Sequence, residues 1–285
     1  MSNGNIVLQP LPLELGWPTY QQSEVERWQD NNLTLQQDFI AEEVPVSLIY
    51  NGTPHVVMLA SPTDLEDFAL GFSITEGIIE KPAELLSSHV YNRSTGIEVR
   101  LQIPEHRFSC LADKGRNLTG RTGCGLCGAS TLEQAIRHTN PVAGSLSLSS
   151  LELHTALANL KQQQKLNQLT GAVHAAAWVK IGQGIQHVRE DVGRHNALDK
   201  LLGLLLRTGS DLSLGFVLVT SRASYEMVQK TASVGVSILA AISAPTGLAI
   251  RLANETGLTL IGFAREDQHV VYSHGQRITH HIYPL

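Results

Sequence analysis

The chain has 285 residues, 42 % of them hydrophobic, so it can bury a substantial core, and its length favours two domains. Its net charge of -5 contrasts with the basic surface that nonspecific nucleic-acid binding requires, so we expect no nucleic-acid partner. No apolar stretch is long enough to span a bilayer, residues 1–22 lack the pattern of a signal peptide, and three cysteines do not suggest a disulfide framework, so we expect a soluble, cytoplasmic protein without a membrane partner.

Residues 1–40 are rich in Gln, Asn and Pro and show no periodicity, so we expect them to form a flexible N-terminal arm. Two apolar runs then flank Asn51 and Gly52, a dipeptide that strongly favours a β-hairpin. The regular part of the chain is therefore expected to begin after the arm.

The segment 61–79 is predicted to be a helix, with Ser61 as its cap and Pro62 at its first position. Residues 96–103 alternate between apolar and polar side chains, as a half-buried strand does. Residues 41–138 are therefore expected to form a small α+β domain that ends in a glycine-rich loop.

Residues 139–285 alternate between strand and helix patterns and are expected to form an α/β domain. Ser149 and Glu152 match a capping box that opens a helix. A hairpin and a helix should follow, and then three strands that alternate with two helices, which predicts parallel strands with right-handed crossovers. In chain order, the hairpin covers 172–190, the first helix 192–206, the strands 214–220, 236–243 and 258–264, and the other helices 223–235 and 245–257.

Ligands of open α/β sheets bind beyond the carboxyl ends of the strands, and this rule selects residues 220–222, 243–246 and 263–265. The first two places combine hydroxyl groups with a helix N-terminus, and Arg222 and Arg265 add positive charge suited to phosphate. The chain has neither a P-loop nor a dinucleotide fingerprint, so position alone suggests a phosphate or nucleotide ligand. Simple helix capping by these hydroxyl groups is an equal alternative.

Polar residues are also dense around the predicted helix 192–206. Arg194 and His195 are of interest because they fall in its first turn, directly after a strand. Asp199 and Lys200 are expected to be ordinary solvated charges. His174 lies in a nearly apolar run and is expected to be a hydrogen-bonded core residue and not a ligand.

The octapeptide RTGCGLCG places Cys124 and Cys127 in a C-x-x-C motif among glycines. Arg121 and a helix that could begin just after Cys127 would both stabilise a thiolate, and the glycines would leave the sulfur atoms exposed. Cys110 lies in a more apolar context and is expected to be packed.

Four interpretations of the C-x-x-C motif compete. A thioredoxin-type dithiol normally follows a strand that is absent from this pattern. A structural zinc site needs four ligands, and the chain offers neither a second C-x-x-C motif nor the Glu of the zinc deaminase signature beside His174. A sulfur carrier would hold a persulfide on one thiol and use the other to release it. Unreactive loop cysteines are the fourth interpretation.

The stretches GRTGCGLCG, HAAAW, EDVGRHNALDKLLG and SRASYEMVQK resemble the FdhD family of formate dehydrogenase accessory sulfurtransferases, over roughly residues 41–273. The resemblance implies a cytidine-deaminase-like α/β domain after a smaller α+β domain. It implies a homodimer that takes sulfur as a persulfide from a cysteine desulfurase. The sulfur would pass to the molybdenum cofactor, in its bis-molybdopterin guanine dinucleotide form, before insertion into the formate dehydrogenase apoenzyme. The cofactor is then a bound substrate, and no metal is permanently held.

By the same resemblance, Cys124 carries the persulfide and Cys127 assists. The cofactor-binding segment matches Phe263, Ala264, Arg265, Glu266, Asp267 and Gln268, although Glu266 and Asp267 replace the basic, glycine-containing pattern of the family. Ser221, Arg222 and His195 are expected to contribute to the same site. A cofactor-insertion chaperone without covalent sulfur transfer and a dithiol oxidoreductase are the alternative functions.

Overall fold

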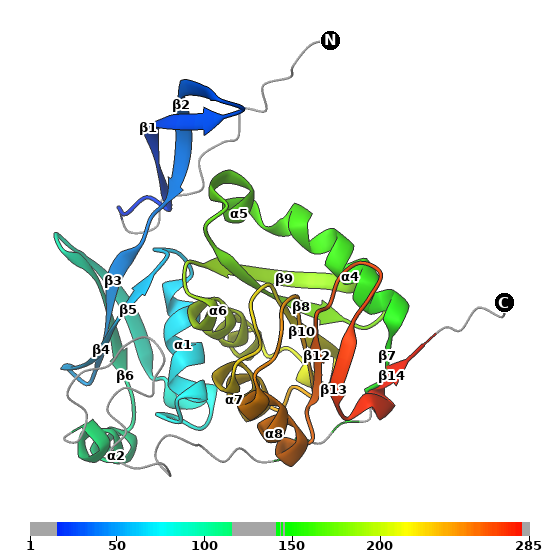
Figure 1. Cartoon of the computed structure of the whole chain (residues 1–285). Coiled ribbons are helices and arrows are strands. Elements are labelled where there is room, and N and C mark those ends of the chain that lie inside the picture. The colour runs from blue at the N-terminus through cyan, green and yellow to red at the C-terminus, as the bar shows by residue number, and fades with distance from the viewer. Residues whose placement is uncertain (1–15, 116–140, 143, 145, 281–285) are drawn as a thin grey trace.

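The computed structural model describes residues 16–115, 141–142, 144 and 146–280, and the side chains of 112–115 are not described. The chain is a mixed α/β structure in which a smaller sheet and a larger sheet enclose helices between them (Figure 1). This arrangement agrees with the expected α/β class and its smaller α+β part. The cytidine-deaminase-like description stays a prediction.

The smaller sheet has four strands in the order β4-β3-β6-β5. The β3–β4 hairpin is confirmed, and its turn residues Asn51 (φ 46°) and Gly52 (φ 85°) both adopt the left-handed conformation that a type I′ turn requires. Alternate residues of β6 are buried, as the alternating pattern predicts. The strands are β3 (Val44–Tyr50), β4 (Thr53–Ala60), β5 (Ser87–Arg93) and β6 (Gly96–Gln102), with a 3₁₀ turn at Pro82–Glu84 and helix α2 (Glu105–Gly115) after β6.

Helix α1 (Leu65–Thr75) packs its apolar side chains against this sheet. It begins at Leu65, three residues after the predicted first position Pro62, and its N-cap is Asp64 in the left-handed conformation (φ 53°) and not Ser61. Ser61 instead links the two halves of the chain, which are the half built on the smaller sheet and the half built on the larger sheet. Its backbone nitrogen donates to Asp191 Oδ2 at 3.0 Å, and its hydroxyl accepts from the nitrogen of Val192 at 3.2 Å.

The larger sheet has six strands in the order β13-β12-β11-β10-β8-β9. Neighbours β10, β11 and β12 are parallel, as the strand–helix alternation predicts, whereas β8, β9 and β13 are antiparallel to their neighbours. The predicted β8–β9 hairpin is confirmed. The strands are β8 (His174–Lys180), β9 (Gly184–Asp191), β10 (Gly215–Val219), β11 (Ile238–Ala241), β12 (Thr259–Gly262) and β13 (Val270–Ser273).

Helices cover both faces of the larger sheet. One face packs on α6, α7 and α8, and the other packs on α4, whose capping box is confirmed by a 3.2 Å bond from the Glu152 nitrogen to Ser149 Oγ. The helices are α4 (Ser150–Gln163), α5 (Lys165–Thr170), α6 (Arg194–Arg207), α7 (Tyr225–Ser233) and α8 (Gly247–Thr256), with 3₁₀ turns at Leu212–Leu214 and Gly275–Arg277 and a short β7 (Leu148–Ser149) to β14 (Ile278–Thr279) pairing.

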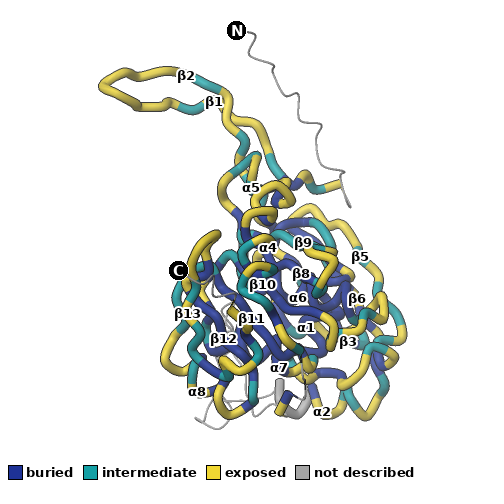
Figure 2. Tube along the Cα trace, turned by 90° about the vertical axis from the view of Figure 1, so that its right-hand side faces the viewer, coloured by how far each residue is buried: buried dark blue, intermediate teal, exposed yellow. Residues whose placement is uncertain are grey.

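The expected N-terminal arm contains regular structure. Strands β1 (Tyr20–Gln29) and β2 (Asn32–Ala41) form an antiparallel hairpin that projects from the body and is mostly exposed (Figures 1 and 2). The lack of apolar alternation reflects this exposure, because a ribbon with water on both faces needs no buried stripe. The expectation that ordered structure begins only after residue 40 is therefore wrong.

Asp199 and Lys200 are buried ion-pair residues, and the expectation that they are solvated charges is wrong. Lys200 Nζ lies 2.8 Å from Asp191 Oδ2, and both side chains are fully buried. Lys230 of α7 lies 2.9 Å from Asp199 Oδ2 and 3.0 Å from Glu76 Oε1 at the end of α1. Helix α1 packs against α6 (Figure 2). Asp199 and Lys200 would be exposed on an isolated α6, but this packing buries them between the two halves.

Candidate functional site

The loops that follow β10, β11 and β12 form one joined edge of the larger sheet, as the strand-end rule predicts. The nitrogen of Ala223 donates to the oxygen of Ala244 at 3.3 Å, and the nitrogen of Thr246 donates back to the oxygen of Ala223 at 3.0 Å. The nitrogen of Phe263 donates to the oxygen of Ser243 at 3.2 Å. The three places selected from the sequence therefore lie side by side, held by backbone bonds.

Phe263 has an unusual backbone for its residue type, with φ at 48°, and its side chain is 40% exposed. A non-glycine residue in the left-handed region costs of order 1 kcal/mol or more, and such strain is concentrated at functional sites. The next residue, Ala264, is fully buried and bonded to Ala241 at 3.0 Å, which fixes the turn. An aromatic ring is thus held exposed at the strand end, where a planar base could stack on it.

The other residues of the expected cofactor-binding segment are exposed. The backbone nitrogen of Arg265 donates to the oxygen of Gln268 at 2.8 Å, which closes a small loop that carries Glu266 and Asp267 at its tip. Arg222 is exposed at the end of the β10 loop, whereas Ser221 is 4% exposed and its hydroxyl donates to the oxygen of Arg222 at 3.0 Å. Arg222 and Arg265 are therefore available to an anionic ligand, and the Ser221 hydroxyl already has an acceptor.

Three helices begin at or near this edge, and their N-termini differ in capping. Thr246 caps α8 by accepting from the nitrogen of Ala249 at 3.3 Å. Gly193 at the N-cap of α6 has no side chain, and Ser224 at the N-cap of α7 makes no side-chain cap bond. Free amide groups at a helix N-terminus attract anions.

His195 lies in the first turn of α6, as predicted, and faces the first turn of α7. Its Nε2 atom is 2.7 Å from Glu226 Oε2, at an angle that forms no hydrogen bond. His174, at the start of β8, is half-buried, and its pKa is lowered by burial and then by the charges of Arg194 and His195. The first turns of α6 and α7 and the start of β8 thus form one polar cluster.

Cys124, Cys127 and Arg121 lie outside the described residues, so their predicted roles stay predictions. Cys110 lies within the described residues, in α2, and is exposed, so the expectation that it is packed is wrong. Helix α2 turns this face to solvent, which a local apolar neighbourhood could not reveal. Cys110 is a free thiol that any labelling experiment on this chain must take into account.

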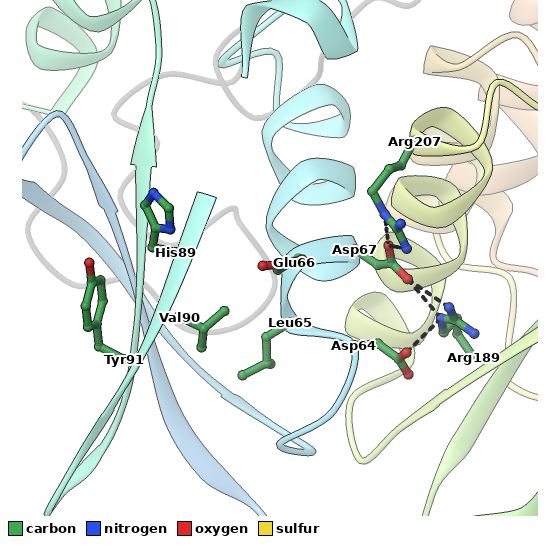
Figure 3. Close-up of a pocket in the computed structure, with 9 residues that line it drawn as sticks. All are labelled: Asp64, Leu65, Glu66, Asp67, His89, Val90, Tyr91, Arg189 and Arg207. Carbon is green, nitrogen blue, oxygen red and sulfur yellow. Dashed lines mark hydrogen bonds and ion pairs between the residues drawn. The ribbon is translucent and has the colours of Figure 1, made fainter. Parts of the chain in front are cut away.

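A pocket in the described part of the chain lies away from this edge. It has a volume of about 520 Å³ and lies between the first turn of α1, strand β5 and the far end of α6 (Figure 3). Asp67 accepts from Arg189 Nη2 at 2.8 Å and from Arg207 Nε at 2.7 Å, and Asp64 Oδ1 lies 3.2 Å from Arg189 Nε, so two carboxylates balance the two guanidinium groups. The pocket lacks an uncompensated charge for an anion, and none of the expected site residues lines it.

Within the described ranges, no group of three or more His, Cys, Asp or Glu side chains is arranged to hold a metal ion. The described helices include none that is long and apolar enough to span a membrane.

Sequence reasoning found the strand-end loops and His195 but missed Ser224 and Glu226. Their sequence signal is weak, because Ser followed by an acidic residue in the first turn is what any well-formed helix start contains. Only the contact between α6 and α7 distinguishes this helix start from an ordinary one.

Comparisons with known proteins agree with one another. The FdhD/NarQ family model matches residues 41–279. The protein named "Sulfur carrier protein FdhD" of Cupriavidus necator is 52% identical over 263 residues, which cover 92% of this chain and 91% of that protein. Its namesake in Xanthomonas euvesicatoria is 50% identical, with 89% and 90% covered. A crystal structure from Desulfotalea psychrophila, described as a formate dehydrogenase accessory protein, has a TM-score of 0.72 at 23% identity and covers 92% of this chain and 100% of that one.

Proposed function

Because this chain belongs to the FdhD/NarQ family, we propose that it is an accessory sulfurtransferase of formate dehydrogenase that carries sulfur as a persulfide on Cys124. The observation that carries the proposal is the glycine-wrapped C-x-x-C motif in a chain that is about half identical, over nine-tenths of its length, to proteins named as sulfur carriers. The donor would be a cysteine desulfurase in the cytoplasm.

The loading step moves one sulfur atom without net oxidation. The Cys124 thiolate attacks the outer sulfur of the donor persulfide, the donor S–S bond breaks, and the donor cysteine leaves as a thiolate. Cys124 then carries the new S–S bond as a persulfide. Arg121, three residues before Cys124, supports the thiolate form that this attack requires.

The release step uses the second thiol. Attack of the Cys127 thiolate on the inner sulfur forms a disulfide with Cys124 and expels the outer sulfur as hydrosulfide. The two electrons come from the cysteine pair, so no outside reductant is needed for one transfer. The acceptor is the molybdenum cofactor with its guanine dinucleotides, bound as a substrate before it enters the formate dehydrogenase apoenzyme.

The joined edge of the larger sheet is the proposed binding site for the guanine nucleotide portion. Phe263 offers an exposed ring for the base, and Arg222 and Arg265 offer exposed charge for the phosphates. Glu266 and Asp267 lie at the exposed tip of the loop that begins at Arg265. A homodimer is proposed as the working assembly.

Intact mass spectrometry after treatment with a cysteine desulfurase and labelled cysteine tests the sulfur step. The wild-type chain should gain sulfur, Cys124→Ala should gain none, and Cys127→Ala should accumulate the persulfide because its release is blocked. Cys110→Ala is the matched control, since it removes an exposed thiol outside the motif and should load like the wild type. Equal loading of Cys124→Ala and the wild type would contradict the proposal, and cofactor binding without any loading would favour an insertion chaperone.

A further inference from the structure

We propose that the first turns of α6 and α7 form a binding site for an oxyanion such as phosphate, and that the Glu226 carboxylate occupies this site when no ligand is bound. The inference does not depend on the sulfur step, but it extends the proposed cofactor-binding site, to which His195 is expected to contribute. It concerns a place beside the strand-end loops, formed by Arg194, His195 and Ser224.

The first observation is a pair of helix N-termini that meet without side-chain caps. Helices α6 and α7 have 14 and 9 residues, and neither receives a capping bond from the residue before it. The 2.7 Å contact between His195 and Glu226 brings their first turns together. Two sets of free amide groups and two positive helix ends therefore converge where an anion would gain from both.

The second observation is a set of buried donors without acceptors. Arg194 Nε, His195 Nε2 and Ser224 Oγ are buried, and none has a hydrogen-bond partner in the part of the chain that the structure describes. His195 is only 8% exposed, and its Nε2 atom is aimed at the first turn of α7. Buried polar atoms without partners are rare because each costs about 1–3 kcal/mol, and we attribute the three at these two helix starts to a ligand.

The charge of the cluster fits an anion. Arg194 forms no ion pair with any described acidic side chain, unlike Arg189 and Arg207, which share Asp67. The pKa of His174 is lowered by burial and then by the nearby charges of Arg194 and His195, against the opposing charge of Asp191, so positive charge lies close to the start of β8. The guanidinium group, the imidazole and the hydroxyl are each able to donate a hydrogen bond to an oxyanion.

Glu226 supplies a negative charge to the site when no ligand is bound. Its carboxylate oxygen lies 2.7 Å from His195 Nε2, yet the poor angle leaves the imidazole donor unsatisfied. A carboxylate in the first turn of α7 also gains from the helix dipole. Glu226 is therefore an imperfect internal anion, which a better-shaped tetrahedral ligand would displace.

Titration calorimetry with inorganic phosphate on the full chain and its variants tests the proposal. Arg194→Gln and Ser224→Ala should weaken phosphate binding, Arg194→Gln by roughly tenfold or more because a charge-assisted bond is lost. Glu226→Gln should tighten binding, because the competing negative charge is gone. Arg251→Gln, on the exposed side of α8, is the matched control and should bind like the wild type.

The Glu226→Gln arm keeps the test decisive, since a gain in affinity cannot come from misfolding. Absence of phosphate binding in both the wild type and Glu226→Gln, or equal binding by Arg194→Gln and the wild type, would overturn the proposal. Guanosine diphosphate distinguishes the sources of the ligand. Competition with phosphate, lost in Arg194→Gln, supports a site for a nucleotide phosphate, whereas simultaneous binding of both supports a site for a free anion.

Discussion

Gly71 of α1 and Gly203 of α6 lie against each other, so closely that a Cβ atom on Gly203 would be 2.8 Å from the backbone nitrogen of Gly71. The same atom would overlap the carbonyl oxygen of Asp67. Neither residue has a left-handed backbone, so glycine is required here for space and not for conformation. This crossing joins the two halves of the chain and sets the position of α6, whose first turn carries Arg194 and His195.

Gly203→Ala should therefore lower the free energy of unfolding by about 1–3 kcal/mol, because overpacking at the crossing outweighs the better helix propensity of alanine. Urea denaturation followed by circular dichroism measures the change. Gly247→Ala is the control, since its Cβ would meet only Arg251 Nη1 at 3.7 Å. A Gly203→Ala variant as stable as the control would show that the two helices can separate without cost.

The Lys200–Asp191 pair gives a second prediction about the contact between the halves. Lys200 Nζ also donates to the oxygen of Ser61 at 3.0 Å, so Lys200→Met should leave both a buried carboxylate and a buried carbonyl group without this partner. We expect a loss of about 3–5 kcal/mol in unfolding free energy. Arg100→Met, which breaks an exposed pair with Glu98, should cost less than about 1 kcal/mol. Similar losses in the two variants would contradict the structural role assigned to Lys200.

Much of the larger sheet could be predicted from the sequence, because its strands are short apolar runs separated by helices with clear caps and periods. The contacts between the halves could not. Asp199 and Lys200 look like an ordinary charged turn of a helix, and their partners Lys230 and Asp191 lie on other elements. The unpartnered donors at Arg194 and Ser224 are invisible for the same reason: a missing bond is a property of three-dimensional packing.

Three half-buried histidines predict how stability depends on pH. Burial lowers the pKa of His174, His187 and His269 below the ordinary value of 6.5, and the neighbouring His154 and His280 lower that of His269 further. The unfolded chain therefore binds more protons than the folded chain once the pH falls below about 6.5, so the unfolding free energy should decrease on acidification. Denaturation at a series of pH values measures the slope. His269→Gln should make it shallower, and an unchanged slope would show that His269 does not contribute.

Phe263 allows the proposed nucleotide site to be tested without harm to the fold. Phe263→Gly removes the exposed ring, and glycine adopts the left-handed backbone at φ 48° without strain, so stability should be unchanged or rise by up to about 1 kcal/mol. Loss of a stacking platform costs about 1–3 kcal/mol per base, so affinity for guanosine diphosphate should fall by roughly fivefold or more. Val270→Gly, at an exposed position of β13, serves as the control for loss of a surface apolar side chain. If Phe263→Gly bound the nucleotide as tightly as the wild type, the base would have to lie elsewhere, and the strained backbone at Phe263 would need another explanation.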